Sequence, residues 1–191
     1  MSSNLSVVQK DKLLHMFELI DVDGNGVLEY ADFRLVVDTM ADDRGWSPTH
    51  RRRLGLVRAN QRLWNMMARH LDADGDGEIT LAEWLSFHMK AFGDDPELQG
   101  KDMELSSALN STAKFFCDML DSDGDGKVSE IDYIMFCGAY NIDSDEAKES
   151  FRLFDTNKDG ILQQNEVFAL VKEFYLSDDE DAPGNIFFGM L

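Results

Sequence analysis

The sequence predicts an all-α protein built from four helix-loop-helix repeats that form two pairs. An acidic segment with one shared pattern recurs four times, and apolar residues spaced three and four apart flank each copy. The composition is that of a globular protein, because 43% of the 191 residues are apolar and 13 are phenylalanine. A chain of this length and content can bury a sizeable core.

The four repeated segments are acidic loops. They read DVDGNGVLEYAD at residues 21–32, DADGDGEITLAE at 72–83, DSDGDGKVSEID at 121–132 and DTNKDGILQQNE at 155–166. Each has Asp at the first place, Asp or Asn at the third and fifth, Gly at the sixth and an acid at the twelfth. One such turn is common in solvated loops, whereas four full matches indicate a repeated cation site.

Helical periodicity surrounds every loop, as expected for helices that bury one face. Around the first two loops the apolar positions are Leu13, Leu14, Met16, Phe17, Ile20, Phe33, Val36, Val37, Met40, Leu63, Met67, Leu71, Trp84, Leu85 and Met89. Around the last two they are Phe115, Met119, Leu120, Tyr133, Phe136, Cys137, Phe151, Phe154, Phe168, Val171 and Phe174. We therefore expect helix, loop, helix four times, with these side chains facing the interior.

The chain is expected to divide into two halves. Residues 1–92 contain the first pair of loops, and residues 104–176 contain the second pair. Residues 93–103 are expected to link them, since this stretch is short and polar, begins with glycine and contains Pro96.

Capping residues predict where some of the helices begin and end. In the first half, Gly45 is expected to close one helix, while Ser47 and Pro48 are expected to start the next. In the second half, Asp143 and Glu146 have the spacing of an N-cap and its reciprocal partner.

The loops have the ligand pattern of a calcium site. Calcium takes about six to eight oxygens at 2.3–2.6 Å, which side chains at places 1, 3, 5 and 12 and a carbonyl at place 7 can supply. The expected side-chain ligands are Asp21, Asp23, Asn25 and Asp32; Asp72, Asp74, Asp76 and Glu83; Asp121, Asp123, Asp125 and Asp132; and Asp155, Asn157, Asp159 and Glu166. The expected carbonyl ligands belong to Val27, Glu78, Lys127 and Ile161. Up to four Ca²⁺ are thus predicted.

An apolar residue after the loop glycine is expected to join each loop to its neighbour through a short antiparallel bridge. The residues expected to do so are Leu28, Ile79, Val128 and Ile161. Loops of this kind should therefore occur in pairs.

The twelfth place differs between loops. Glu83 and Glu166 can offer two oxygens to the ion, as calcium accepts and magnesium does not. Asp32 and Asp132 are one methylene shorter and more easily offer one oxygen, which favours the octahedral shell of magnesium. We expect Mg²⁺ to compete best at these two loops. The fourth loop carries the fewest acids and is expected to be the weaker of the Glu-ended pair.

Charge and hydropathy exclude several classes of partner. The net charge of −19 argues against nucleic acid and anionic membranes and in favour of divalent cations. No apolar run is long enough for a transmembrane helix, and the N-terminal residues are too polar for a signal peptide. Cys117 and Cys137 are expected to be reduced thiols in the core. These features predict a soluble, cytoplasmic and monomeric protein.

Catalytic motifs are not expected. The acids belong to the loops, and the sequence shows neither a phosphate-binding glycine loop nor a nucleophile elbow. The protein is therefore predicted not to be an enzyme.

Three features of the sequence each allow two interpretations, a functional one and a simpler, structural one. The arginines at 51, 52, 53, 58, 62 and 69 could form a basic helix for a partner, or could balance nearby carboxylates within the chain. The ten methionines could line an opening groove or pack in the core. The aromatic residues Trp46, Trp64, Trp84, Phe115, Phe116 and Tyr133 could enclose a small apolar ligand or pack against one another. The simpler interpretation is favoured in each case.

The four loops resemble EF-hands, and the resemblance extends over nearly the whole chain. The wide spacing of loops in the first half, the Asp-ended first loop and the C-terminal segment APGNIFFGML are similar to the sarcoplasmic calcium-binding protein family and its calexcitin-like and bacterial relatives. The layout is also similar to that of the coelenterazine-binding proteins. The resemblance implies one compact unit in which the two pairs share an apolar interior and residues 177–191 close it. Family members usually have a degenerate loop, whereas all four loops here keep their ligands.

The resemblance implies a cytosolic Ca²⁺ and Mg²⁺ buffer or calcium-signal modulator. Two alternatives stay open on the sequence. One is a calcium sensor that exposes an apolar surface to a target protein, and the other is a calcium-regulated carrier of a small apolar ligand such as a luciferin.

Overall fold

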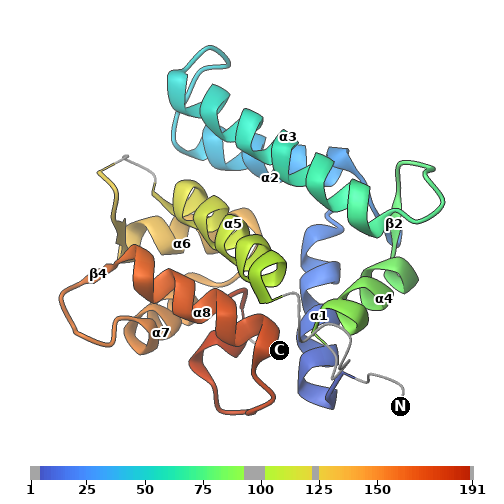
Figure 1. Cartoon of the computed structure of the whole chain (residues 1–191). Helices are drawn as coiled ribbons and strands as arrows, with labels where there is room; N and C mark the ends of the chain where they lie inside the picture. Colours follow the sequence, from blue (N-terminus) through green and yellow to red (C-terminus); the bar gives the residue numbers. More distant parts are fainter. Residues whose placement is uncertain (1–4, 93–101, 122–124, 190–191) are drawn as a thin grey trace.

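The protein consists of α-helices joined by loops, with only two-residue strands. The computed structural model describes residues 5–92, 102–121 and 125–189, without the side chains of residues 91, 92, 102–108 and 111. The first half contains α1 (Val7–Ile20), β1 (Val27–Leu28), α2 (Tyr30–Asp43), α3 (Arg51–Leu71), β2 (Ile79–Thr80) and α4 (Leu81–Phe92). The second half contains α5 (Asp102–Leu120), β3 (Val128–Ser129), α6 (Glu130–Ala139), α7 (Ser144–Phe154), β4 (Ile161–Leu162), α8 (Gln164–Leu176) and the 3₁₀ helix η1 (Pro183–Ile186). The predicted all-α class is confirmed (Figure 1).

The loops are joined in pairs by antiparallel two-stranded bridges. β1 pairs with β2, and Leu28 lies opposite Ile79, as the sequence predicts. In the second half β3 pairs with β4, but Val128 lies opposite Leu162 rather than Ile161. The expectation for Ile161 was wrong because Leu162 is the eighth residue of its loop and Ile161 the seventh. Leu162 is fully buried, whereas Ile161 lies opposite Ser129.

Helix boundaries agree with the caps in part. Gly45 has φ +65° just after α2, as a closing glycine should. Asp143 caps α7 by accepting from the amides of Asp145 and Glu146. The expected start of α3 at Ser47 was wrong, since the helix begins at Arg51. The Ser47 carbonyl instead accepts from His50 N–H in a tight turn, and the His50 ring stacks on Trp46.

The apolar interior is shared by the two halves. α3 packs against α5, α2 against α6, and α1 against α8, so helices of both halves enclose one core. Trp64, Trp84, Phe116 and Tyr133 are buried there among other apolar side chains, as ordinary packing predicts. Met89 was expected in the interior but is exposed.

The described part of the C-terminal tail packs on α7 and α8. Phe187 and Phe188 are buried, and the Tyr133 hydroxyl donates to the Phe187 carbonyl at 3.0 Å. Gly184 approaches α8 so closely that an added Cβ would lie 2.6 Å from the Leu170 carbonyl oxygen. Only glycine fits there without moving the tail away from the helix. The tail therefore closes the core from the C-terminal side.

Lys12 on α1 is a buried cation that joins the N-terminal helix to this tail. Its exposed fraction is 0%, and burial lowers its pKa to about 8 against the opposing charges of Glu173 and Asp178. Its ammonium donates to the Ser177 carbonyl at 2.8 Å, to Asn185 Oδ1 at 2.9 Å and to the Glu173 carbonyl at 3.2 Å. Two of these acceptors lie at the C-terminal end of α8, where a positive charge is favourable. Sequence periodicity does not reveal this role, because the hydrogen-bond acceptors of Lys12 lie more than 160 residues further along the chain.

Several expectations concern segments at the margins of the described chain. Most of the expected linker at 93–103 lies outside the described residues, and its last two residues already belong to α5. None of the described helices is both long enough and apolar enough to cross a membrane. Cys117 and Cys137 are free thiols, of which Cys137 is buried and Cys117 half-buried.

Replacing Lys12 with methionine is expected to lower the free energy of unfolding by about 2–4 kcal/mol, because it removes three hydrogen bonds and leaves the Ser177 carbonyl and the buried Asn185 Oδ1 without this donor. Urea denaturation of the metal-free protein measures this loss. Lys10→Met removes an exposed lysine from the same helix and should change stability by less than about 0.5 kcal/mol. Equal stabilities of the two variants would show that Lys12 does not hold the tail.

Candidate metal centre

The four loops share one backbone hydrogen bond that folds them around their first aspartate. In each loop the amide of the sixth-place glycine donates to a carboxylate oxygen of the first-place aspartate. The pairs and their N···O distances are Gly26–Asp21, 2.9 Å; Gly77–Asp72, 3.1 Å; Gly126–Asp121, 3.0 Å; and Gly160–Asp155, 2.8 Å. These glycines have φ between 81° and 89°, a region that costs other residues energy.

A second hydrogen bond recurs between the fifth and seventh places. The seventh-place amide donates to the fifth-place side-chain oxygen, which turns the seventh residue in the same way in every loop. The pairs are Val27–Asn25, 2.9 Å; Glu78–Asp76, 2.9 Å; Lys127–Asp125, 2.9 Å; and Ile161–Asp159, 3.0 Å. The four loops thus share the turn from the fifth to the seventh place, which the structure describes in each of them.

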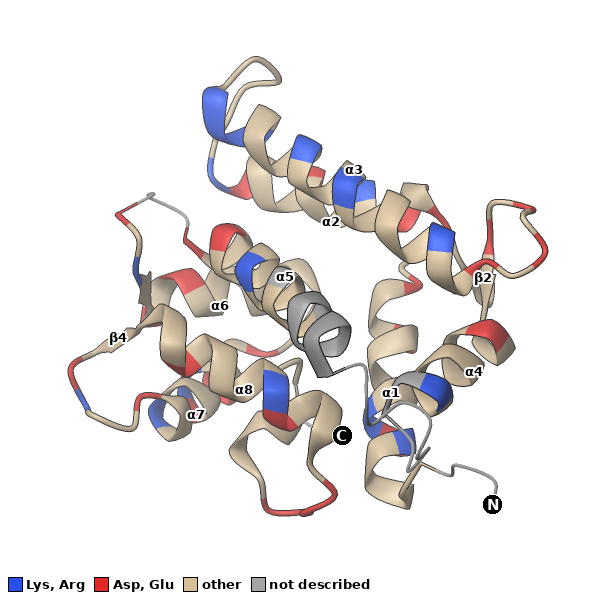
Figure 2. Ribbon diagram, in the orientation of Figure 1, with Lys and Arg blue, Asp and Glu red and all other residues tan. Residues whose placement is uncertain are grey.

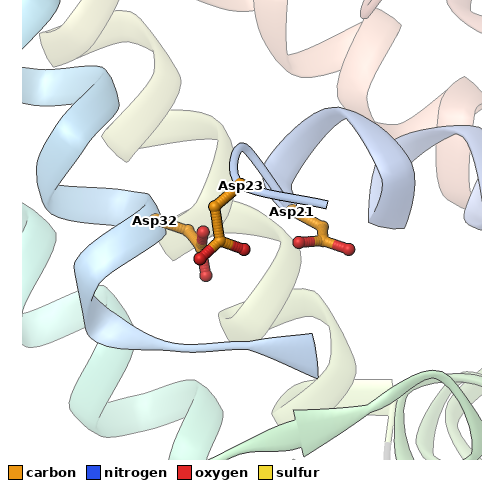
Figure 3. Close-up of side chains that lie close together, drawn as sticks. All are labelled: Asp21, Asp23 and Asp32. Atoms are coloured by element: carbon orange, nitrogen blue, oxygen red, sulfur yellow. The ribbon is translucent and has the colours of Figure 1, made fainter. Parts of the chain in front are cut away.

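The first loop brings three carboxylates together. Asp21 follows α1, Asp23 lies in the loop, and Asp32 lies in the first turn of α2 (Figure 3). Each contributes an oxygen, and these three atoms lie within 4.8 Å of one another. Burial raises the pKa of Asp32, the Glu29 amide opposes this effect, and the charges of Asp23 and Asp21 add to it. The cluster therefore favours a cation.

The second loop also has a cluster, formed by its first, third and fifth places rather than by its first, third and twelfth. Asp72, Asp74 and Asp76 place one oxygen each within 4.8 Å of one another. Two oxygens on opposite sides of a calcium ion are about 4.6–5.2 Å apart, so both clusters have dimensions that suit this ion. An all-oxygen donor set of carboxylates suits calcium or magnesium rather than a softer metal.

The twelfth-place acids differ in reach. Asp32 Oδ2 accepts from Glu29 N–H at 2.8 Å, within the same helix cap. Glu83 Oε2 accepts from Thr80 N–H at 2.9 Å, and its other oxygen spans the loop to Ala73 N–H at 2.8 Å. These amides lower the pKa of Glu83, with that of Thr80 having the largest effect. The longer side chain is thus held across the mouth of its loop by amides on both sides, and it lies outside the cluster formed by Asp72, Asp74 and Asp76.

The second half repeats this difference. Asp132 Oδ2 accepts from the amide of Ser129 at 2.9 Å and from its hydroxyl at 2.6 Å. Glu166 accepts from Gln163 N–H at 3.0 Å and, with its other oxygen, from the Thr156 hydroxyl at 3.0 Å. Each half therefore contains one loop closed by Asp and one closed by Glu.

The fourth loop departs from the others at its fourth place. Lys158 has φ +60°, whereas Gly24 and Gly75 occupy this left-handed position in the first two loops. A lysine there costs conformational energy and adds a positive charge next to the ligands. The sequence already predicts a weaker fourth loop, because Asn157 stands in place of an acid. The conformation and charge of Lys158 are a second reason for the same expectation.

Among the described residues, the structure brings six of the expected ligands into two clusters, and the roles of all the expected ligands stay a prediction. The first and second loops contain the carboxylate clusters, and in the third loop Asp123 lies outside the described residues. The carbonyl groups expected to bind the ion belong to the seventh-place residues, whose amides close the shared turn. These residues are Val27, Glu78, Lys127 and Ile161.

Two residues orient ligands, a role that was not predicted from the sequence, where Thr80 was expected only to add an oxygen to the second loop. Thr80 and Ser129 hold the carboxylates of Glu83 and Asp132 through reciprocal caps. The signal was present, because Ser or Thr three residues before an acid is the capping-box pattern.

Comparison with known proteins identifies the repeats. A family model described as "EF hand" matches residues 15–37 and 69–88, and one described as "EF-hand domain pair" matches residues 135–173. Calerythrin of Saccharopolyspora erythraea is 25% identical over 170 residues, which cover 89% of this chain and 93% of calerythrin.

Two solved structures share the fold over nearly the whole chain. The calcium-loaded apo form of the coelenterazine-binding protein from Renilla muelleri has a TM-score of 0.76 and 21% identity, covering 98% of this chain and 100% of that one. A sarcoplasmic calcium-binding protein from amphioxus has a TM-score of 0.70 and 18% identity, with the same coverage. Because the sequence identities are this low, the two comparisons show similarity of fold alone.

Replacing Asp32 or Asp132 with glutamate is expected to raise the selectivity of that loop for calcium over magnesium by roughly threefold to tenfold, because the longer side chain can supply a second oxygen. Calorimetric calcium titrations at several fixed magnesium concentrations measure the change. Glu83→Asp is the matched reverse variant and should lower the selectivity of the second loop. Unchanged magnesium competition in all three variants would contradict the assignment.

Proposed function

We propose, on the premise that the chain is a calcium-binding EF-hand protein related to calerythrin, that it is a Ca²⁺ and Mg²⁺ buffer or calcium-signal modulator of the sarcoplasmic calcium-binding type. In this role the loops take up cations while the apolar interior stays closed. The twenty ligands expected from the sequence form four sites, and the loops ending in Asp32 and Asp132 accept magnesium most readily.

The observation that carries the proposal is the closed interior shared by both halves. The tail residues Phe187 and Phe188 are buried in it, and Lys12 fastens α1 to the same tail. The large apolar side chains that are exposed in the described chain come from seven different segments, namely Val7, Val22, Leu35, Leu54, Met89, Ile131 and Leu153. A sensor that docks on a target helix needs a contiguous apolar surface instead.

The carrier alternative is less favoured. The coelenterazine-binding protein shares the fold, but the aromatic residues of this chain pack against one another. For example, the Trp84 ring lies 4.3 Å from that of His88, which in turn stacks on Tyr175 at 5.9 Å. We propose that the protein is a monomer of the cytoplasm and is not an enzyme.

Calcium titration with magnesium present tests this function. We expect up to four calcium ions per chain, with two sites that magnesium occupies most effectively. An apolar-surface dye should change its fluorescence little between the metal-free and calcium-loaded states, since the core stays closed. A large calcium-induced rise in dye fluorescence would favour the sensor, and the absence of calcium binding would refute the buffer.

A second candidate function, docking of an acidic partner segment, is favoured by one face of α3. Arg51, Arg58, Arg62 and Arg69 are exposed and lie seven, four and seven residues apart. At 3.6 residues per turn they form one straight row about 27 Å long. None of the four forms an ion pair with another described residue, whereas Arg53, on another face of α3, pairs with Asp38 and Asp42. The ion pairs of Arg53 balance charge within the chain, whereas the four exposed arginines are available to a partner. Figure 2 shows the basic residues along α3 in blue.

The row suits a narrow acidic helix rather than a membrane or nucleic acid. Guanidinium groups pair well with single carboxylates, and the row is one residue wide. A broad polyanion would also meet the acidic loops of a chain with net charge −19. The partner we propose is a helical segment with glutamates at matching spacing.

A synthetic helical peptide with glutamates seven, four and seven residues apart tests this docking. The double change Arg58→Gln and Arg62→Gln is expected to weaken binding by roughly threefold to tenfold. Arg34→Gln, which removes an arginine from α2, is the control. Equal binding by both variants, or binding to anionic vesicles rather than to the peptide, would contradict the proposed partner.

A further inference from the structure

The first loop contains the only Asn-Gly pair of the sequence, at residues 25 and 26. The other three loops carry aspartate at this fifth place, namely Asp76, Asp125 and Asp159. Asn25 and Gly26 are both exposed, and an added Cβ on Gly26 would meet nothing within 4 Å. A glycine nitrogen has no side chain beside it, so it is the least hindered nucleophile that can follow an asparagine.

An asparagine followed by glycine can modify itself, which is one reason why asparagine is thermolabile. The backbone nitrogen of the glycine attacks Cγ of the asparagine, a succinimide ring forms, and the side-chain amino group leaves as ammonia. Water then opens the ring at one of its two carbonyls. One opening leaves aspartate, and the other leaves isoaspartate, in which the main chain runs through the side-chain carbon. The reaction needs no enzyme and no oxidant.

The contacts of Asn25 supply the groups that this reaction uses. The Gly26 N–H, whose proton must leave, donates to Asp21 Oδ2 at 2.9 Å, and this carboxylate can accept the proton. Asn25 Oδ1, which gains negative charge when Cγ is attacked, accepts from Val27 N–H at 2.9 Å. Asn25 Nδ2, the leaving group, donates to Asp23 Oδ2 at 3.2 Å. Both carboxylates belong to the cluster of the first loop (Figure 3).

We propose that Asn25 is a self-modification site, at which cyclisation with Gly26 converts the first loop into an aspartate or isoaspartate form. The Gly26 proton goes to Asp21 and from there, through solvent, to the departing amino group, so that ammonia leaves. The aspartate form has the same fifth-place residue as the other three loops. The isoaspartate form lengthens the main chain by one atom before Gly26 and displaces its amide from Asp21.

Occupancy of the loop controls the reaction, and this part of the inference rests on the proposed function. Asn25 is an expected side-chain ligand, and a bound cation would hold its oxygen, so that the side chain cannot turn to meet the Gly26 nitrogen. Only the empty loop then reacts. At a calcium concentration about ten times the dissociation constant, about one loop in eleven is empty, and the reaction is roughly tenfold slower. The extent of modification thus measures how long the first loop has lacked a cation.

Mass spectrometry of the folded, metal-free protein, kept at physiological temperature for several days, tests the modification. The peptide that contains Asn25 should show the mass increase of deamidation, and electron-transfer fragmentation distinguishes isoaspartate from aspartate. A parallel sample with calcium should show the increase roughly tenfold more slowly. Asn157 is the internal control, because it is an exposed amide of the fourth loop but precedes Lys158, and it should stay unmodified. Asn25→Gln would need a larger ring and should stay intact at this position.

Asn25→Asp reproduces the aspartate product and tests its effect on the loop. It adds a fourth carboxylate to those of Asp21, Asp23 and Asp32, as in the second loop. Calcium binding at the first loop should tighten roughly threefold to tenfold, because affinity rises with the charge of the ligands. The NMR resonance of the Gly26 amide, which donates to Asp21, reports on this loop. Asn25→Gln is the neutral control and should not tighten binding.

The outcomes separate the modification from the proposed function. If Asn25 of the folded, metal-free protein is modified no faster than Asn157, the self-modification site is refuted and the proposed function is unaffected. If the Gly26 resonance responds to calcium but calcium does not slow the reaction, control by occupancy is wrong. If the Gly26 resonance does not respond to calcium, the proposed function fails at the first loop, and a mass increase at Asn25 still supports the modification.

Discussion

Loop pairing is the constraint on which the rest of the structure depends. A twelve-residue loop that crowds several carboxylates cannot bury much of its own surface, and each one here is fastened to a second through a two-residue antiparallel bridge. The bridge positions Leu28, Ile79, Val128 and Leu162 are all buried, so the loops are anchored in the core at the point where they meet. This anchoring sets the relative positions of the flanking helices. The two pairs then bury their remaining apolar faces against each other.

The closure of the core explains why cation binding and apolar exposure are separated in the proposed function. Lys12, Gly184 and the two tail phenylalanines hold the N-terminal helix, α8 and the tail together through residues that belong to none of the four loops. A cation entering a loop neutralises local carboxylates without having to open this contact. A buffer needs only that local event, whereas a sensor needs the core to open.

The sites are tuned by residues outside their ligand sets. Thr80 and Ser129 hold the carboxylates of Glu83 and Asp132, and Lys158 adds strain and charge to the fourth loop. Similar ligand lists can thus give unequal affinities. If all four loops bind cations, as we propose, these surroundings predict four affinities rather than one.

The sequence by itself determined the class of fold, the four loops, their expected ligands and the Leu28–Ile79 bridge. These features depend on residues within one loop or one helical turn, where spacing decides which atoms can meet. Only the tertiary structure decided the burial of Lys12 and the exposure of Met89. Each of these depends on which helices pack together, and residues far apart in the chain come into contact only after the two halves have joined around one core.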